Sequence, residues 1–121
     1  MDKIGILLYG YKQPDALSLQ KAIEEAVGRK VALLSASGME NNTLGETLEE
    51  ANCTRFEENE TPVLIFLGFG DEEIKNTLRI ATGEKVRRPI FCSLTKENIR
   101  WPLHVLIDHL KEEDMYWKNR K

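Results

Sequence analysis

Short apolar runs alternate along the chain with amphipathic segments, and this pattern predicts four strands, each followed by a helix. Residues 3–11, KIGILLYGY, and residues 30–37, KVALLSAS, are short apolar runs of the kind that forms buried strands. Residues 63–69, VLIFLGF, and residues 89–95, PIFCSLT, have the same character later in the chain. Continuous apolar runs of this length are typical of strands that are covered on both faces of a sheet.

Between these runs, apolar residues recur at the three- and four-residue spacing of an amphipathic helix. Pro14 suits the first position of such a helix, and Gly28 suits its end. Thr43 and Glu46 have the spacing of a capping box, which predicts the start of a short helix. The predicted helices span residues 14–28, 43–52, 71–83 and 101 onward.

A shift of the sequence by 58 residues places strand on strand and helix on helix. It carries Gly10 onto Gly68 and Tyr11 onto Phe69. We interpret this as an internal repeat of two βαβα halves, because one half alone would have too few strands for a stable sheet. The single α/β domain spans residues 1–121, with halves at residues 1–58 and 59–121.

Strand–helix–strand crossovers are right-handed and produce parallel strand pairs. We therefore predict an α/β fold in which one four-stranded, mostly parallel sheet in the order 2-1-3-4 has helices on both faces. The sequence leaves open whether the halves join in parallel or antiparallel about a pseudo-twofold axis.

The segment LIFLGFGDEE, residues 64–73, has the order strand, glycine, helix that many phosphate-binding loops share. However, Asp71, Glu72 and Glu73 follow the glycines directly, and carboxylates at the positive end of a helix repel a phosphate. The full G-x-G-x-x-G motif is also incomplete. We predict that Gly68, like Gly10, only allows a sharp turn from strand to helix.

Composition and charge narrow the class of protein. The net charge of −3 argues against a general nucleic-acid binder. The chain shows neither a secretory signal nor an apolar segment near the roughly 20 residues of a membrane span, so we expect a cytosolic protein. Residues 40–60 hold seven Glu and one Arg, whereas basic residues gather in residues 84–100. Such a polarised surface suits a protein partner or a second copy of the chain.

Candidate chemistry is sparse. Cys53 and Cys92 lack the spacing of a metal site, and His104 and His109 are five residues apart on the last predicted helix. We expect no catalytic residue, no metal and no cofactor.

The most distinctive segment is SLTKENIRWPL, residues 93–103. One interpretation is structural: Trp101 fills the junction between strand and helix, while Thr95 and Asn98 satisfy backbone groups of a turn. The other is a recognition surface in which cations flank an aromatic anchor. The candidate interaction surface comprises Arg87, Arg88, Thr95, Lys96, Asn98, Arg100 and Trp101.

Two functions fit these features. The first is a non-enzymatic module that acts by protein interaction or self-association, with a regulatory role. The alternative is a protein that binds a metabolite or anion, or an enzyme, with its site at the carboxyl ends of the strands. The candidate crevice comprises Gly10, Tyr11, Gly68, Phe69 and Thr95. We expect neither nucleic acid nor membrane as a partner.

The second half of the chain also resembles a known family. Gly68-Phe69 follows an apolar strand and Asp71-Glu72 opens a helix, after which comes PIFCSLTKENIRWPLHVLIDHLKEE. This pattern, over residues 62–113, resembles a bacterial family catalogued as domain of unknown function 3783. The resemblance implies a small bacterial α/β protein and implies no catalytic residues.

Overall fold

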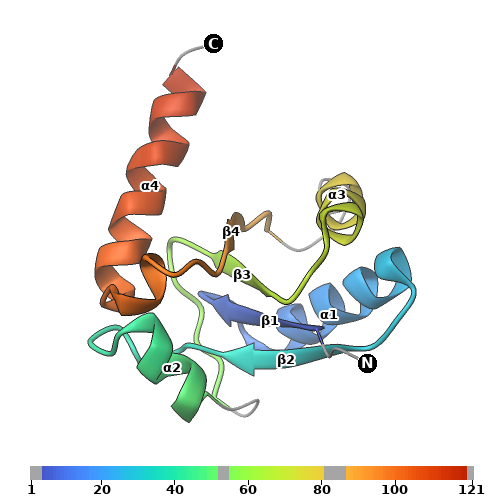
Figure 1. The fold of residues 1–121 in the computed structure, drawn as a ribbon, viewed down its shortest axis with the longest axis horizontal. Helices are drawn as coiled ribbons and strands as arrows, with labels where there is room; N and C mark the ends of the chain where they lie inside the picture. Colours follow the sequence, from blue (N-terminus) through green and yellow to red (C-terminus); the bar gives the residue numbers. More distant parts are fainter. Residues whose placement is uncertain (1–3, 52–54, 81–86, 120–121) are drawn as a thin grey trace.

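A four-stranded sheet lies between two pairs of helices in the computed structural model of the chain (Figure 1). The structure describes residues 4–51, 55–80 and 87–119. Each predicted strand and helix is present, although the predicted end of the third helix at Gly83 lies outside the described residues. In chain order the elements are β1 (Ile4–Tyr9), α1 (Gln13–Val27), β2 (Val31–Ser35), α2 (Leu44–Glu50), β3 (Val63–Leu67), α3 (Asp71–Ile80), β4 (Ile90–Ser93), the 3-10 helix η1 (Asn98–Arg100) and α4 (Leu103–Asn119).

The strand order is β2-β1-β3-β4, which confirms the predicted α/β fold. β1 and β2 are parallel, as are β3 and β4, because each pair is connected through a helix. The central pair, β1 and β3, is antiparallel. The two βαβα halves therefore join antiparallel, which answers the question that the sequence left open.

The strand registers match the 58-residue shift between the halves. Ile4 pairs with Val31 and Val63 pairs with Ile90, so both parallel pairs are offset by 27 residues. At the central join Leu7 pairs with Ile65, which is also the residue that the shift places on Leu7. This strand register is the one that a twofold axis through the Leu7–Ile65 pair would give.

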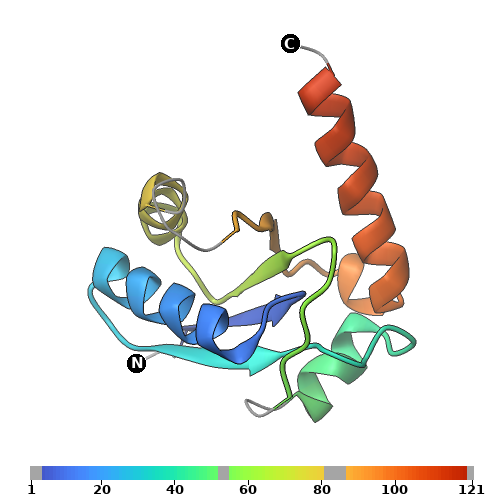
Figure 2. The ribbon, with the colours of Figure 1, turned by 180° about the vertical axis from the view of Figure 1, so that it is seen from behind.

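Two separate cores cover the two faces of the sheet (Figures 1 and 2). Alternate residues of a strand point to opposite faces, so Ile6 and Leu8 contact the side of α1 and α3, while Leu7 contacts the side of α2 and α4. Complete burial of such a side chain stabilises the fold by about 1.5–3 kcal/mol. On the second face the buried residues of α4 are Leu103, Leu106, Ile107 and Leu110.

The helix ends follow the sequence signals. The Thr43 hydroxyl accepts the Glu46 N–H at 3.1 Å, and the Glu46 carboxylate accepts the Thr43 N–H at 2.9 Å. This is the predicted capping box at the start of α2. α1 ends at Gly28, whose φ of +76° is the left-handed conformation that glycine adopts without strain.

The C-terminal part of α4 projects beyond the sheet, as Figure 1 shows. Met115 and Tyr116 on this part are more than half exposed, at 59% and 55%. Within the described ranges, no helix combines the length and the apolar character that crossing a bilayer requires.

Candidate functional site

The antiparallel join separates the residues that the sequence suggested for one crevice. Gly10 and Tyr11 follow β1, whose end lies beside the start of β3. Gly68 and Phe69 follow β3, and Thr95 follows β4, so these three lie at the opposite end of the sheet. The prediction of a single crevice from these five residues is wrong. It required β1 and β3 to be parallel, so that their carboxyl ends would lie at the same end of the sheet, but the two strands are antiparallel.

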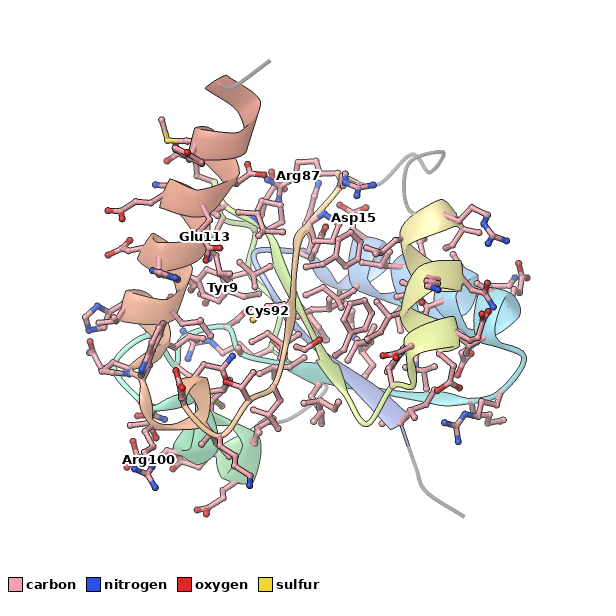
Figure 3. All side chains as sticks on the ribbon, turned by 45° about the horizontal axis from the view of Figure 1, so that its top comes forward. Tyr9, Asp15, Arg87, Cys92, Arg100 and Glu113 are labelled. Carbon is pink, nitrogen blue, oxygen red and sulfur yellow. The ribbon has the colours of Figure 1, made fainter. Side chains whose placement is uncertain are left out.

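The candidate interaction surface divides in the same way. Arg87 and Arg88 precede β4, whereas Thr95 and the residues up to Trp101 follow it. Figure 3 shows Arg87 and Arg100 far apart, with Arg87 above the middle of the sheet and Arg100 at the lower left, beside the start of α4. These residues therefore do not form one continuous recognition surface.

Arg87 fastens the segment before β4 to the first half of the chain. Its guanidinium donates to the carbonyl of Gly10 at 2.6 Å and to that of Asn59 at 2.9 Å. The Tyr11 hydroxyl donates to the Arg87 carbonyl at 2.6 Å. Burial raises the pKa of Tyr11, and the nearby Arg87 cation opposes this shift. Arg87 and Tyr11 thus join the segment before β4 to the residues that follow β1.

Thr95 and Asn98 close a turn on each other. The Asn98 side-chain oxygen accepts the Thr95 N–H at 2.8 Å, and the Thr95 hydroxyl accepts the Asn98 N–H at 3.0 Å. The buried Asn98 amide also donates to the Ser93 carbonyl at 2.9 Å. Trp101 is half-buried and meets the His109 ring edge-on, with ring centroids 5.4 Å apart. This geometry favours the structural interpretation of the segment, in which the turn fixes the end of β4.

Lys96 and Arg100 flank an apolar hollow at the same end of the sheet. The hollow has a volume of about 450 Å³, and Leu94, Thr95 and Ile99 complete its lining. Both cations are exposed. This is the part of the predicted surface at which cations and apolar atoms meet.

The start of α3 does not keep all the free backbone N–H groups of a phosphate-binding loop, because the Glu73 carboxylate bonds to the Gly70 N–H. The Glu73 carboxylate accepts the Gly70 N–H at 2.9 Å and forms two hydrogen bonds with Arg29, at 2.8 and 3.1 Å. The bond with Arg29, followed by that with Gly70, lowers the pKa of Glu73. The charged form is therefore favoured in the fold, and its stabilising effect is lost as the pH falls through this lowered pKa. A carboxylate of the chain itself therefore takes up the Gly70 N–H at this helix start, so that this N–H is not available to a phosphate.

The sequence did not single out the outer edge of β4. β4 is the last strand of the sheet, with β3 on one side. The Ile90 N–H donates to the Pro62 carbonyl, and the Leu94 N–H donates to that of Phe66. In a parallel pair, alternate residues direct both backbone groups to the same neighbour, so the intervening Phe91 and Ser93 point outward. Asn98 already satisfies the Ser93 carbonyl, so with respect to the described residues the Phe91 N–H and C=O and the Ser93 N–H remain along this edge.

The Phe91 side chain anchors the edge. Its ring stacks on that of Phe66, with centroids 5.6 Å apart. The Arg88 guanidinium lies 5.2 Å from the Phe91 ring centroid on the exposed side. The outward backbone groups are therefore held in a defined position, and free backbone groups of this kind serve as a template for another strand.

A groove runs between β4 and α4 on the other face of the sheet. Two adjoining hollows of about 260 and 170 Å³ form it, and both are lined by Leu110 and Glu113. Ile90 lines the first and Cys92 the second. Figure 3 shows Cys92 and Glu113 in this region. Burial raises the pKa of the Cys92 thiol, as does the nearby Glu113 carboxylate.

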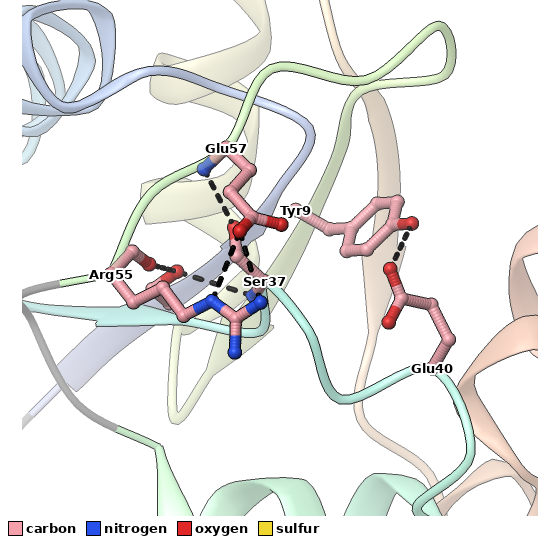
Figure 4. A network of polar contacts seen from close by, with 6 residues as sticks. Tyr9, Ser37, Glu40, Arg55 and Glu57 are labelled. Carbon is pink, nitrogen blue, oxygen red and sulfur yellow. Dashed lines mark hydrogen bonds and ion pairs between the residues drawn. The ribbon is translucent and has the colours of Figure 1, made fainter.

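The opposite edge of the sheet is covered near the end of β2 (Figure 4). The Ser35 hydroxyl donates to the Arg55 carbonyl. The Glu57 N–H donates to the Ser37 hydroxyl at 3.0 Å, and the Arg55 side chain pairs with the Glu57 carboxylate. The segment after α2 therefore lies against β2, while β4 faces outward without such a cover in the described part of the chain.

Features typical of a reaction centre are scarce across the described ranges. No group of three or more His, Cys, Asp or Glu side chains there could hold a metal ion. Every buried side-chain nitrogen or oxygen among these residues has a hydrogen-bond partner.

The segment from β3 to α4 is also the part of the chain that matches a known protein family. Residues 62–117 match the family described as Domain of unknown function (DUF3783). This confirms the resemblance for the second half of the chain. The matched residues contain the outer edge of β4, the turn that fixes its end and the groove beside α4. Searches of curated proteins and of solved structures found no match.

Proposed function

We propose that the protein is a small bacterial, cytosolic, non-enzymatic module that binds a protein along the outer edge of β4. The observation that carries this proposal is the set of outward backbone groups at Phe91 and Ser93 beside the groove. Proteins with such an edge bind an extended strand through main-chain hydrogen bonds and side-chain pockets. Its role would be regulatory, exerted through the binding of its protein partner.

The residues around the edge support this role. The Thr95–Asn98 turn fixes one end of β4, and Arg87 fastens the segment at the other end. An edge that is held in place before binding loses little conformational entropy when a partner strand arrives. The groove between Ile90 and Leu110 then supplies apolar surface for side chains of the added strand.

Photo-crosslinking from the two edge strands tests the proposal. A benzophenone amino acid at Ser93 on β4 is compared with the same amino acid at Ala32 on β2, since both residues are exposed. In living cells, we expect position 93 to yield discrete adducts and position 32 to yield only background, because only the β4 edge accepts a strand. The measurement is the adduct pattern on a denaturing gel, with mass spectrometry of each band.

Both variants must unfold at the temperature of the unmodified chain for the comparison to count. Equal labelling from the two positions, or no adduct from position 93, would contradict a binding role for β4.

The alternative function, binding of a small anionic metabolite, is supported by the hollow between Lys96 and Arg100. The two exposed cations beside this shallow apolar hollow would attract an anion. On this alternative, an anionic metabolite raises the unfolding temperature of the natural chain and leaves that of a Lys96→Glu, Arg100→Glu double variant unchanged. A metabolite screen without such a shift would remove it.

A further inference from the structure

We propose that the partner at the β4 edge is a second copy of this chain. The two β4 strands would pair antiparallel about a twofold axis at Phe91 and form one continuous eight-stranded sheet. This inference rests on the proposed function and names the occupant of the same edge.

The backbone of Phe91 is suited to meet itself. In an antiparallel ladder, the two residues of a hydrogen-bonded pair exchange both of their N–H···O=C bonds. Phe91 directs its N–H and its C=O to the same outer side of β4. Two copies related by a twofold axis can therefore satisfy these groups with each other.

The neighbouring positions fit the same register. Ser93 of one copy faces Pro89 of the other, where an ordinary residue would bring an N–H that needs the Ser93 carbonyl. Proline has no such N–H. The Ser93 carbonyl is already bonded to the Asn98 side chain at 2.9 Å. Pro89 thus has no N–H that would lack a partner, and the Ser93 carbonyl opposite it is already bonded to Asn98.

The side chains agree with this pairing on both faces. Ile90 of one copy faces Cys92 of the other, and both side chains lie on the α4 face beside the groove. Across the twofold axis, the two Phe91 rings become neighbours on the opposite face. Arg88 faces Leu94, so no like charges stand opposite each other within residues 88–94.

The composition of the edge also favours a strand partner. Residues 90–94, IFCSL, contain neither a charged side chain nor a proline, the residues that commonly protect the free edge of a monomeric sheet. At the opposite edge of the sheet, the segment around Arg55 lies against the end of β2. In the described part of the chain, the end of β2 is therefore covered, whereas β4 is open to a second copy.

A register-specific disulfide tests this dimer. In a chain with Cys53→Ser, the Ile90→Cys substitution places a new thiol opposite the natural Cys92 of the second copy. The Cα atoms of such a non-hydrogen-bonded pair are about 4.5 Å apart, which a disulfide can span. We expect mild oxidation to double the mass of this variant on a non-reducing gel, with two disulfides for each dimer.

The matched control is Leu94→Cys in the same background. Its side chain lies on the same face of β4 but faces Arg88 of the second copy, so after oxidation this variant should still run at the mass of one chain on the non-reducing gel. Equal crosslinking of the two variants, or none in either, overturns the proposed register.

Sedimentation equilibrium of the unmodified chain keeps the test independent of the cysteine variants. We expect twice the monomer mass, and the mass of one chain for Ser93→Pro, which removes only an outward N–H. A natural chain that is monomeric at every concentration overturns the dimer. If position 93 then still labels a different protein, the binding edge stands and only its occupant was wrong; if it labels nothing, the binding role fails as well.

Discussion

Gly10→Ala is expected to lower the free energy of unfolding by about 2–4 kcal/mol, because the substitution adds backbone strain to a steric clash. Gly10 has a φ of +91°, in the region that favours glycine. A Cβ atom there would lie 2.9 Å from the Thr61 carbonyl oxygen and 3.0 Å from the Pro62 Cα. Both neighbours are backbone atoms, so neither can move aside without disturbing the entry to β3. Urea denaturation of the variant measures the change.

Gly28→Ala is the control for this prediction. Gly28 has a similar φ of +76°, but a Cβ atom there would meet nothing within 4 Å. The loss should therefore be only about 1–2 kcal/mol, from the left-handed backbone alone. If both variants lost the same stability, the close approach of Gly10 to the strand entry would play no part.

Asn98→Ala is expected to lower the free energy of unfolding by about 1–3 kcal/mol, because it leaves partly buried backbone groups without their partner. Asn98 is 7% exposed and bonds both the Thr95 N–H and the Ser93 carbonyl. Its loss would free the end of β4 and the start of η1 together. Chemical denaturation gives the size of the effect.

The control for the turn is Lys96→Ala, two residues earlier. Lys96 is exposed, and its removal should change the unfolding free energy by less than about 0.5 kcal/mol. If Asn98→Ala proved equally mild, Asn98 would be free for binding, and the structural role of the turn would be wrong.

Much of the fold follows from the sequence because its signals are local. The strands are apolar runs, and the Thr43–Glu46 box and Gly28 mark helix ends, so each element could be predicted from its own residues. The strand–helix–strand crossovers predicted the parallel strand pair within each half. That the two halves derive from one repeated unit stays a prediction, which the shared register at Leu7 and Ile65 supports.

The direction of the join between the halves could not be predicted. It depends on the path of residues 51–62 from α2 to β3, a polar segment without a periodic pattern. The prediction of a common crevice for Gly10 and Gly68 depended on that direction, and it failed for this reason. Side-chain patterns alone do not show which backbone groups of an edge strand remain free. Phe91 and Ser93 therefore passed unnoticed, although the uncharged run PIFCSL was a signal for them.

The turn after β4 shows how one set of residues permits two interpretations from sequence. Thr95 and Asn98 are small polar residues at a strand end, where both ligands and turns select them. The reciprocal hydrogen bonds place them in the turn. In the proposed function, their contribution to binding is indirect, because they hold β4 in the position at which its edge would pair.

Amide hydrogen exchange at Phe91, Cys92 and Ser93 tests the central claim, an open β4 edge that closes on binding, most directly. Measured residue by residue by NMR in dilute protein, the Cys92 amide should exchange slowly because it bonds to β3, while those of Phe91 and Ser93 exchange fast. At high protein concentration, or with the bound partner, all three should become slow. Phe91 and Ser93 amides that were as protected as Cys92 at high dilution, or that never gained protection, would contradict the account.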